Sequence, residues 1–305
     1  MPADDGQIEP MSQPAPSWLR GVFPDESIAS AARLGWGFRN ETWRVDLKDG
    51  RRVVAAGLAD PDRAADLIVL TRLLQPRLGA VGLPVPSLVE LASQPTGVVV
   101  TEFVDGVAGA ALLNRSGGAA LIGSLLGTIW HRLASIDTAG LPLATDWTDG
   151  RSLAETSLRR LADLEPRLRP AERDRMEMKI RGLPDLLAGR PPAFVHGDLL
   201  PVNIIVRDDR LAALVDFEFA RLADPLLDAS WLVSILTFHH PASEQELWAA
   251  FTAAADLRPE EVRTHRLLEV LPVVRYLEIL AAPRITAKQS RRWLTMLQAH
   301  LARTA

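Results

Sequence analysis

Cysteine is absent from the sequence, and this absence excludes disulfide frameworks, thiolate zinc sites, iron–sulfur clusters and thiol nucleophiles. The six histidines are scattered, and no two of them have the i, i+4 spacing that places a zinc-binding pair on one face of a helix. Any metal ion is therefore expected to be a hard cation bound through oxygen atoms.

The sequence also lacks an excess of positive charge and long apolar runs. Its 34 Lys and Arg are outnumbered by 38 Asp and Glu, so the net charge of −4 provides no overall positive field that would gather nucleic acid. Every apolar run is shorter than the roughly 18 residues that a transmembrane helix needs. Residues 1–16 are acidic and proline-rich and lack the basic start and apolar run of a secretory signal. We therefore expect a cytoplasmic protein that binds neither nucleic acid nor membranes.

Length and composition nevertheless support a large folded core. With 305 residues, of which 48% are hydrophobic, the chain is long enough for two domains. Residues 19–104 are β-rich, because apolar alternation on both sides of the turn at Lys48–Gly50 predicts a hairpin over residues 42–56. A helix is expected from residue 60 to residue 74, and residues 97–103 predict a short buried strand.

The remainder of the chain is mainly helical. Residues 105–305 form the second expected domain, and residues 1–18 are expected to be a disordered tail. Helical periodicity predicts helices over residues 119–136, 153–168, 171–181, 228–237, 244–255, 259–281 in one or two pieces, and 286–302. Trp231 lies on an apolar helical face and is expected to pack in the core. One non-helical segment, residues 193–216, interrupts the helices with three short strands and a turn at Asp208-Asp209.

The polar residues of this segment suit phosphoryl transfer. It contains His196-Gly197-Asp198 and, five residues after the aspartate, Asn203; Asp216 follows thirteen residues later. Transfer of a phosphoryl group needs an acceptor hydroxyl held in line, a carboxylate beside that hydroxyl, and cations that neutralise the phosphates. Asp198 suits the carboxylate role, while Asn203 and Asp216 offer oxygen ligands to Mg²⁺, which takes few protein ligands.

The pattern His-Gly-Asp, four residues, Asn, followed by Val-Asp-Phe-Glu, resembles the aminoglycoside phosphotransferase and choline kinase family of kinase-fold enzymes. The resemblance implies that Asp198 is the catalytic base and that Asn203 and Asp216 bind magnesium. It also implies that Glu218 is a further group at or beside the metal, because choline-kinase-like relatives carry an acid at this position.

Two supporting residues also follow from the resemblance. His196 would brace the loop that carries the catalytic base, and Asp228 would be a buried structural carboxylate at the start of the next helix. Asp224, which precedes Pro225, is interpreted as a helix cap.

The resemblance extends to the first domain and covers roughly residues 35–231. The segment that begins Gly35-Trp36-Gly37-Phe38-Arg39-Asn40 resembles the loop that covers the nucleotide. The segment Thr101–Gly106 resembles the hinge whose backbone meets the base. The residues assigned to nucleotide binding on this ground are Gly35, Gly37, Arg39, Asn40, Glu102, Phe103 and Val104.

The sequence departs from the family on the third strand. Relatives carry a Lys or Arg there that holds the phosphates, and an acid on the following helix that holds this cation. Here the basic position falls at Ala55 or Ala56, and lysine is absent between Lys48 and Lys179. One interpretation is that Arg39, or Arg52 with a shifted register, supplies the positive charge. The other is that the chain is a pseudokinase that serves as a nucleotide-binding or scaffold module.

Because the base and both metal ligands are present, the sequence favours an active enzyme. We expect an α+β, two-lobed protein-kinase-like fold with a small β-rich N-terminal lobe and a larger, mainly helical C-terminal lobe. The expected activity is transfer of the γ-phosphate of ATP or GTP, with Mg²⁺, to a hydroxyl of a small molecule. An antibiotic, a sugar, an amino-alcohol or a peptide hydroxyl in a biosynthetic pathway all remain open as acceptors.

Overall fold

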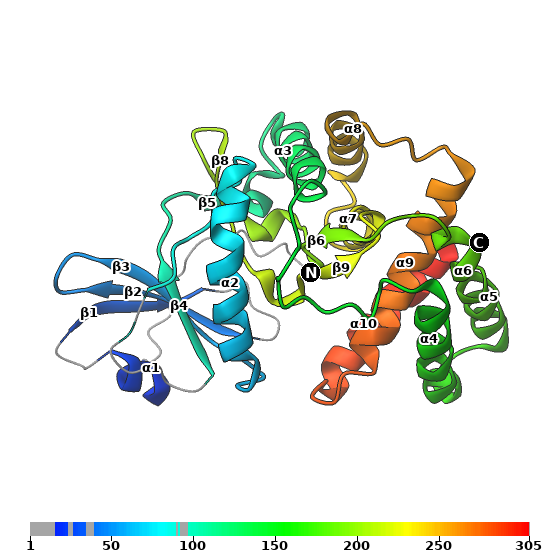
Figure 1. The fold of residues 1–305 in the computed structure, drawn as a ribbon, viewed down its shortest axis with the longest axis horizontal. Coiled ribbons are helices and arrows are strands. Elements are labelled where there is room, and N and C mark those ends of the chain that lie inside the picture. Colours follow the sequence, from blue (N-terminus) through cyan, green and yellow to red (C-terminus); the bar gives the residue numbers. More distant parts are fainter. Residues whose placement is uncertain (1–15, 24–26, 35–39, 90, 92–96, 305) are drawn as a thin grey trace. The chain divides into compact units, whose positions relative to one another are not determined.

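The computed structural model describes residues 16–23, 27–34, 40–89, 91 and 97–304, and the chain divides into two compact units (Figure 1). Unit 1 comprises Met1–Leu112, Ala139–Pro142 and Pro201–Glu218, and unit 2 comprises Leu113–Thr138, Leu143–Leu200 and Phe219–Ala305. The architecture is mixed α and β, with the larger sheet in unit 1 and most helices in unit 2. Among the described residues, no helix combines the length and the apolar character needed to cross a membrane.

Unit 1 contains a four-stranded antiparallel sheet with the strand order β1-β2-β3-β4. Its strands are β1 (Ile28–Arg33), β2 (Glu41–Leu47), β3 (Arg52–Gly57) and β4 (Val98–Glu102). The predicted hairpin is confirmed as β2 and β3, and its turn includes Gly50 at φ +88°, a conformation that glycine adopts without strain. The sequence analysis did not assign β1, which pairs with β2.

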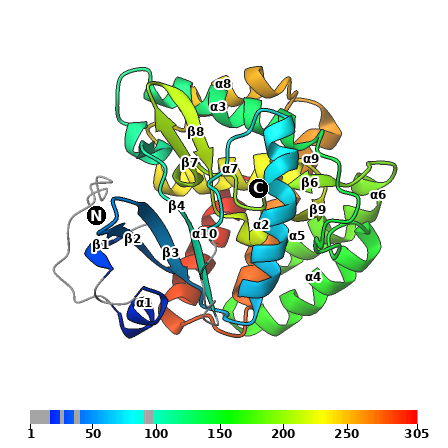
Figure 2. The same ribbon diagram turned by 60° about the vertical axis from the view of Figure 1, so that its left-hand side comes forward.

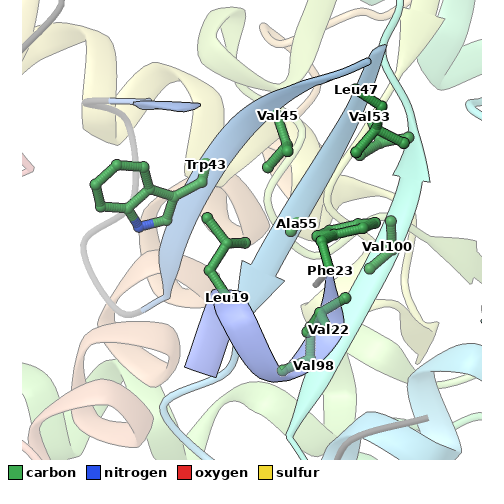
Figure 3. Close-up of a cluster of buried hydrophobic side chains, with 10 residues drawn as sticks. All are labelled: Leu19, Val22, Phe23, Trp43, Val45, Leu47, Val53, Ala55, Val98 and Val100. Carbon is green, nitrogen blue, oxygen red and sulfur yellow. The ribbon is translucent and has the colours of Figure 1, made fainter. Parts of the chain in front are cut away.

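A short helix, α1 (Ser17–Val22), covers one face of this sheet and closes its core. Figure 3 shows Leu19 and Phe23 packed toward side chains of β2, β3 and β4. Trp43 and Val45 alternate with exposed or half-buried neighbours along β2, as a sheet with one buried face requires. The sequence analysis did not predict this helix, because six residues are too few to show helical periodicity.

The helix α2 (Arg63–Ala80) lies beside β4 in both ribbon views (Figures 1 and 2). The expected helix ended at Leu74, but the observed helix continues for six more residues. Pro76 lies inside it and removes only one backbone hydrogen-bond donor, which the final turns tolerate.

A second sheet in unit 1, with strand order β5-β7-β8, contains much of the polar segment that the sequence singled out. Its strands are β5 (Val107–Ala108), β7 (Ile204–Arg207) and β8 (Arg210–Leu214). Asp208 and Asp209 form the predicted turn between β7 and β8, with φ values of +52° and +57°. Aspartate tolerates this left-handed region better than most residues, which explains the pair at this turn.

Unit 2 is mainly helical and also contains the two-stranded pair β6 (Ala193–Val195) and β9 (Arg221–Ala223). Its helices are α3 (Gly118–Leu133), α4 (Gly150–Leu164), α5 (Pro170–Arg181), α6 (Leu183–Leu187), α7 (Leu226–His239), α8 (Glu244–Ala255), α9 (Val262–Leu280) and α10 (Ala287–Arg303). The predicted helix 244–255 is confirmed residue for residue, and α9 is a single helix that accommodates Pro272. The short α6 was not predicted.

Helices α3 and α8 lie side by side in both views because glycines let their backbones approach closely (Figures 1 and 2). A Cβ atom on Gly127 would overlap the carbonyl oxygen of Phe251 and lie 2.9 Å from the Cβ of Ala254. Gly123 meets Leu247 and Ala250 in the same way. Small residues at these positions therefore determine the spacing of the two helices.

We predict that Gly127→Ala lowers the melting temperature by several degrees, because overpacking a close contact costs about 1–3 kcal/mol. The matched control is Gly79→Ala in α2, where an added Cβ meets no atom within 4 Å. Since alanine is the better helix former, the control variant should melt at or above the temperature of the wild-type protein. Equal melting temperatures for the two variants would contradict the proposed packing.

Candidate active site

The two predicted metal ligands of unit 1 lie at the same end of the β7–β8 hairpin. Asn203 directly precedes β7, and Asp216 is the second residue after β8. The N–H of Val215 donates to the carbonyl oxygen of Asn203 at 3.0 Å, which extends the ladder of the hairpin by one step. The antiparallel register therefore brings an amide-bearing residue next to a carboxylate-bearing segment.

Asp216 adopts a left-handed backbone conformation and lies outside regular secondary structure. Its φ is +67°, in the left-handed region that a non-glycine residue seldom adopts, and its side chain is exposed. One carboxylate oxygen accepts the N–H of Glu218 at 3.4 Å. The turn thus presents an accessible carboxylate beside Asn203, which is buried.

The oxygen donors of this site fit a hard cation. Within the described part of the chain, no three His, Cys, Asp or Glu side chains cluster as a ready-made metal site. A carboxylate and an amide oxygen on one hairpin end suit Mg²⁺, which completes its shell with water and phosphate oxygens.

Glu218 joins three segments of unit 1 that are distant in sequence. Its side chain is buried, and one carboxylate oxygen accepts a hydrogen bond from Nδ2 of Asn40 at 2.8 Å. Nη2 of Arg63 donates to the backbone carbonyl of Glu218 at 2.8 Å, and Nη1 lies 3.8 Å from its carboxylate. The N–H of Ala59 in turn donates to Oδ1 of Asn40 at 3.1 Å. Burial of this carboxylate is thus accompanied by an amide donor and a cation, as burial of charge requires.

Arg63 is the participant that the sequence analysis did not select. It is the first residue of α2 and the first basic residue after Arg52. That position, just beyond the third strand, is the sequence signal that would have identified it.

The third strand carries no basic residue at the expected position, Ala55 or Ala56, as the sequence indicated. Ala55 is 0% exposed and points into the core shown in Figure 3, opposite Trp43 and Val100. Ala56 lies on the other face of β3, half-buried between Thr42 and Val99 in the sheet.

Arg52 does not substitute for the missing cation at this position. Its guanidinium pairs with both carboxylate oxygens of Asp105, at 2.7 and 2.6 Å, and lies 5.1 Å from the ring centroid of Phe103. This pairing lowers the pKa of Asp105 through the hydrogen bonds from Arg52. In this structure Arg52 thus fixes the segment after β4.

The backbone of the hinge-like segment is held at Glu102 and Phe103. The N–H of Glu102 donates to the carbonyl of Ser87 at 2.9 Å, and the N–H of Phe103 donates to that of Arg52 at 3.0 Å. Val104 follows directly and is half-buried. The other residues assigned to nucleotide binding, Gly35, Gly37 and Arg39, lie outside the described residues.

In unit 2, a buried carboxylate holds the loop that precedes Asp198. Asp228, in the first turn of α7, accepts the N–H groups of His196 and Gly197 at 2.8 and 2.7 Å. Burial raises the pKa of Asp228 to about 7, although these two N–H groups act in the opposite direction. Gly197 has φ +77°, and a Cβ there would overlap the carbonyl of Phe219, so this turn requires glycine.

Asp198 is half-buried, and an aromatic side chain holds it. Nε1 of Trp231 donates to one carboxylate oxygen of Asp198 at 2.8 Å. The Trp231 indole is 2% exposed, stacks on Trp293 at 5.9 Å between centroids, and meets the ring of Tyr276 edge-on at 5.1 Å. The expected core position of Trp231 is confirmed, but its role as a hydrogen-bond donor to Asp198 was not predicted. Its place three residues after Asp228, on the same helical face, is the signal that could have revealed it.

The start of α7 also has its predicted cap. Asp224 accepts the N–H of Leu226 at 2.9 Å and forms an ion pair with Arg190. Both contacts fix the first turn of the helix that carries Asp228 and Trp231.

We predict that Asp228→Asn lowers the melting temperature and that the loss depends on pH. The NH₂ group of a carboxamide accepts no hydrogen bond, whereas both oxygens of Asp228 can accept one in either protonation state, so about 1–3 kcal/mol is expected to be lost. The folded-state pKa of Asp228, about 7, lies above its ordinary value of 3.8. Its protonated form therefore contributes stability that is complete below about pH 4 and is lost as pH rises through 7. The difference in melting temperature between the wild type and the variant should therefore be smaller at about pH 8 than at about pH 5.5.

Melting curves at these two pH values test this prediction. The control is Asp185→Asn in α6, where the carboxylate is exposed and the variant should melt like the wild type at both pH values. A difference in melting temperature that stays the same at both pH values would contradict the prediction, because it would show that Asp228 is already ionised in the folded protein at about pH 5.5.

Comparisons with known proteins identify the family and the fold of the chain. Residues 30–268 match the model of the phosphotransferase enzyme family. A homoserine kinase from Rhizobium johnstonii is 31% identical over 131 residues, which is 37% of this chain and 40% of that protein, so the match spans less than half of this relative. The solved GDP complex of aminoglycoside 2'-phosphotransferase-IIIa has a TM-score of 0.70 at 20% identity, over 94% of this chain and 97% of that chain. A macrolide 2'-phosphotransferase from Brachybacterium faecium has a TM-score of 0.60 at 18% identity, over 88% and 92% of the two chains.

Proposed function

Because the chain belongs to the phosphotransferase enzyme family, whose members phosphorylate hydroxyl groups, we propose that it transfers the γ-phosphate of ATP or GTP to a hydroxyl of a small molecule. The observation that carries this proposal is the pair of oxygen donors, Asn203 and Asp216, at one end of the β7–β8 hairpin. In the sequence, Asn203 follows Asp198 by five residues, and Trp231 holds the Asp198 carboxylate. The cytoplasmic location expected from the sequence is part of the same proposal.

We assign Asp198 the role of catalytic base. In the reaction, the acceptor oxygen forms a bond to the γ-phosphorus, the bond from this phosphorus to the β–γ bridging oxygen breaks, and the nucleoside diphosphate leaves. The proton of the acceptor hydroxyl passes to the Asp198 carboxylate. The hydrogen bond from Trp231 occupies one carboxylate oxygen and orients the other. His196 and Asp228 support the loop through backbone hydrogen bonds rather than by reacting.

Asn203 and Asp216 are the residues we assign to magnesium. When bound, Mg²⁺ neutralises charge on the phosphates of the nucleotide. The exposed Asp216 carboxylate and the Asn203 amide would hold it, while Glu218 is engaged by Asn40 and Arg63 and therefore serves chiefly to tether these segments. The backbone of residues 102–104 is assigned to the nucleotide base.

The acceptor class is supported by the names of the similar proteins. They include a homoserine kinase and aminoglycoside and macrolide phosphotransferases, all of which indicate a hydroxyl on a small molecule. An acceptor screen should therefore begin with homoserine, an aminoglycoside and a macrolide. An antibiotic, a sugar or an amino-alcohol is the proposed class, with a peptide hydroxyl as the alternative acceptor.

The absence of a basic residue at the expected position of β3 favours a second candidate function. A protein that binds nucleotide without turnover would need no cation at Ala55 or Ala56 and could act as a scaffold. Turnover with any acceptor separates the two candidates, because a pseudokinase would bind nucleotide and release no diphosphate.

We predict that Asp198→Ala lowers turnover by at least about a hundredfold and leaves nucleotide affinity within about twofold, because a general base acts on the acceptor rather than on the nucleotide. The measurements are diphosphate release in the presence of an acceptor and calorimetric titration with ATP. The matched control, Asp208→Asn at the β7–β8 turn, keeps a residue that tolerates positive φ and should retain full turnover. Joint loss of binding and turnover in a folded Asp198→Ala protein would contradict the assignment.

A further inference from the structure

The proposed function leaves one requirement unmet by the third strand. A nucleoside triphosphate carries several negative charges, and sites that transfer its phosphoryl group supply fixed cations in addition to magnesium. On β3, Ala55 is in the core, Ala56 is neutral, and Arg52 is paired with Asp105. The cation must therefore come from outside these β3 positions. Arg39, the other candidate from the sequence, lies outside the described residues, so the remaining candidates are the described cations of unit 1.

Arg63 has the position and the surroundings for this role. Nη2 is bonded to the carbonyl of Glu218, two residues after Asp216, so the guanidinium lies against the segment that we assign to magnesium. Asn40, which ends the loop assigned to the nucleotide, bonds the same Glu218. One short segment thus connects the loop assigned to the nucleotide, the proposed metal ligand and a cation.

The pair between Arg63 and Glu218 leaves the cation accessible while the carboxylate is buried. The Glu218 side chain is 8% exposed, whereas that of Arg63 is 47% exposed, and 3.8 Å separates Nη1 from the carboxylate. A guanidinium has five N–H donors in a fixed fork that matches phosphate oxygens. Arg63 therefore presents an accessible fork while a buried carboxylate and a carbonyl anchor it.

We propose that Arg63 is the phosphate-binding cation of this enzyme and replaces the basic residue absent from the third strand. Glu218 positions it and takes the place of the acid that relatives carry on the following helix. This inference rests on the proposed function, because it assigns a residue to the nucleotide of that same site.

Calorimetric titrations of the full-length protein with Mg²⁺ and a non-hydrolysable ATP analogue, and separately with adenosine, test the proposal. Arg63→Ala should weaken binding of the analogue about tenfold or more, as loss of a charge-assisted hydrogen bond implies, and leave adenosine binding unchanged. Arg63→Lys keeps the charge without the fork and should fall between the alanine variant and the wild type. Arg51→Ala is the matched control: it removes an exposed cation that is paired with Asp49 at the β2–β3 turn, and it should bind like the wild type.

Equal affinity of wild type and Arg63→Ala for the analogue would overturn the proposal, and so would a loss confined to Arg52→Ala. Equal losses for the analogue and adenosine would show that Arg63 supports the fold of the site and does not bind phosphate. If the alanine variant unfolds, Arg63→Gln, which is neutral and of similar length, replaces it in the same comparison. Absence of nucleotide binding by the wild-type protein would instead overturn the proposed function itself, so the two failures are distinguishable.

Discussion

The buried carboxylate of Glu218 is the interaction on which the arrangement of unit 1 depends. Without partners its charge would be costly to bury, and it is held by the amide of Asn40 and accompanied by the guanidinium of Arg63. Because those partners come from the end of one loop and the start of α2, burying one charge fixes three segments together. Glu218 also donates its backbone N–H to the carboxylate of Asp216, so the residue that joins these segments contacts the proposed metal ligand.

In unit 2, a buried carboxylate likewise holds the loop that contains Asp198. Asp228 is 1% exposed and accepts two backbone N–H groups of that loop, while Trp231 from the same helix donates to Asp198. A single helix start therefore fixes both the backbone and the side chain of the proposed base. A preorganised carboxylate needs no rearrangement when the acceptor hydroxyl arrives, which is the property that makes such groups effective.

Local patterns in the sequence predicted much of the fold, and contacts between distant residues account for most of what it missed. Alternation and turn chemistry identified the β2–β3 and β7–β8 hairpins with Asp208-Asp209 at the second turn, and periodicity identified α8 residue for residue. The pairing of Arg63 with Glu218 spans 155 residues, and no local pattern encodes it. The sequence did not reveal the hydrogen bond from Trp231 to Asp198 for another reason. A buried indole can pack in the core and donate a hydrogen bond at the same time, and only the packing was predicted.

The melting temperature of the wild-type protein with ATP and with GTP, each with and without magnesium, tests the central claim most directly. At one hundred times its dissociation constant a ligand stabilises the folded state by about 2.7 kcal/mol. That stabilisation corresponds to a rise of several degrees at ~2–4 °C per kcal/mol. The account predicts such a rise with at least one nucleotide and only when magnesium is present. No rise with either nucleotide would contradict it.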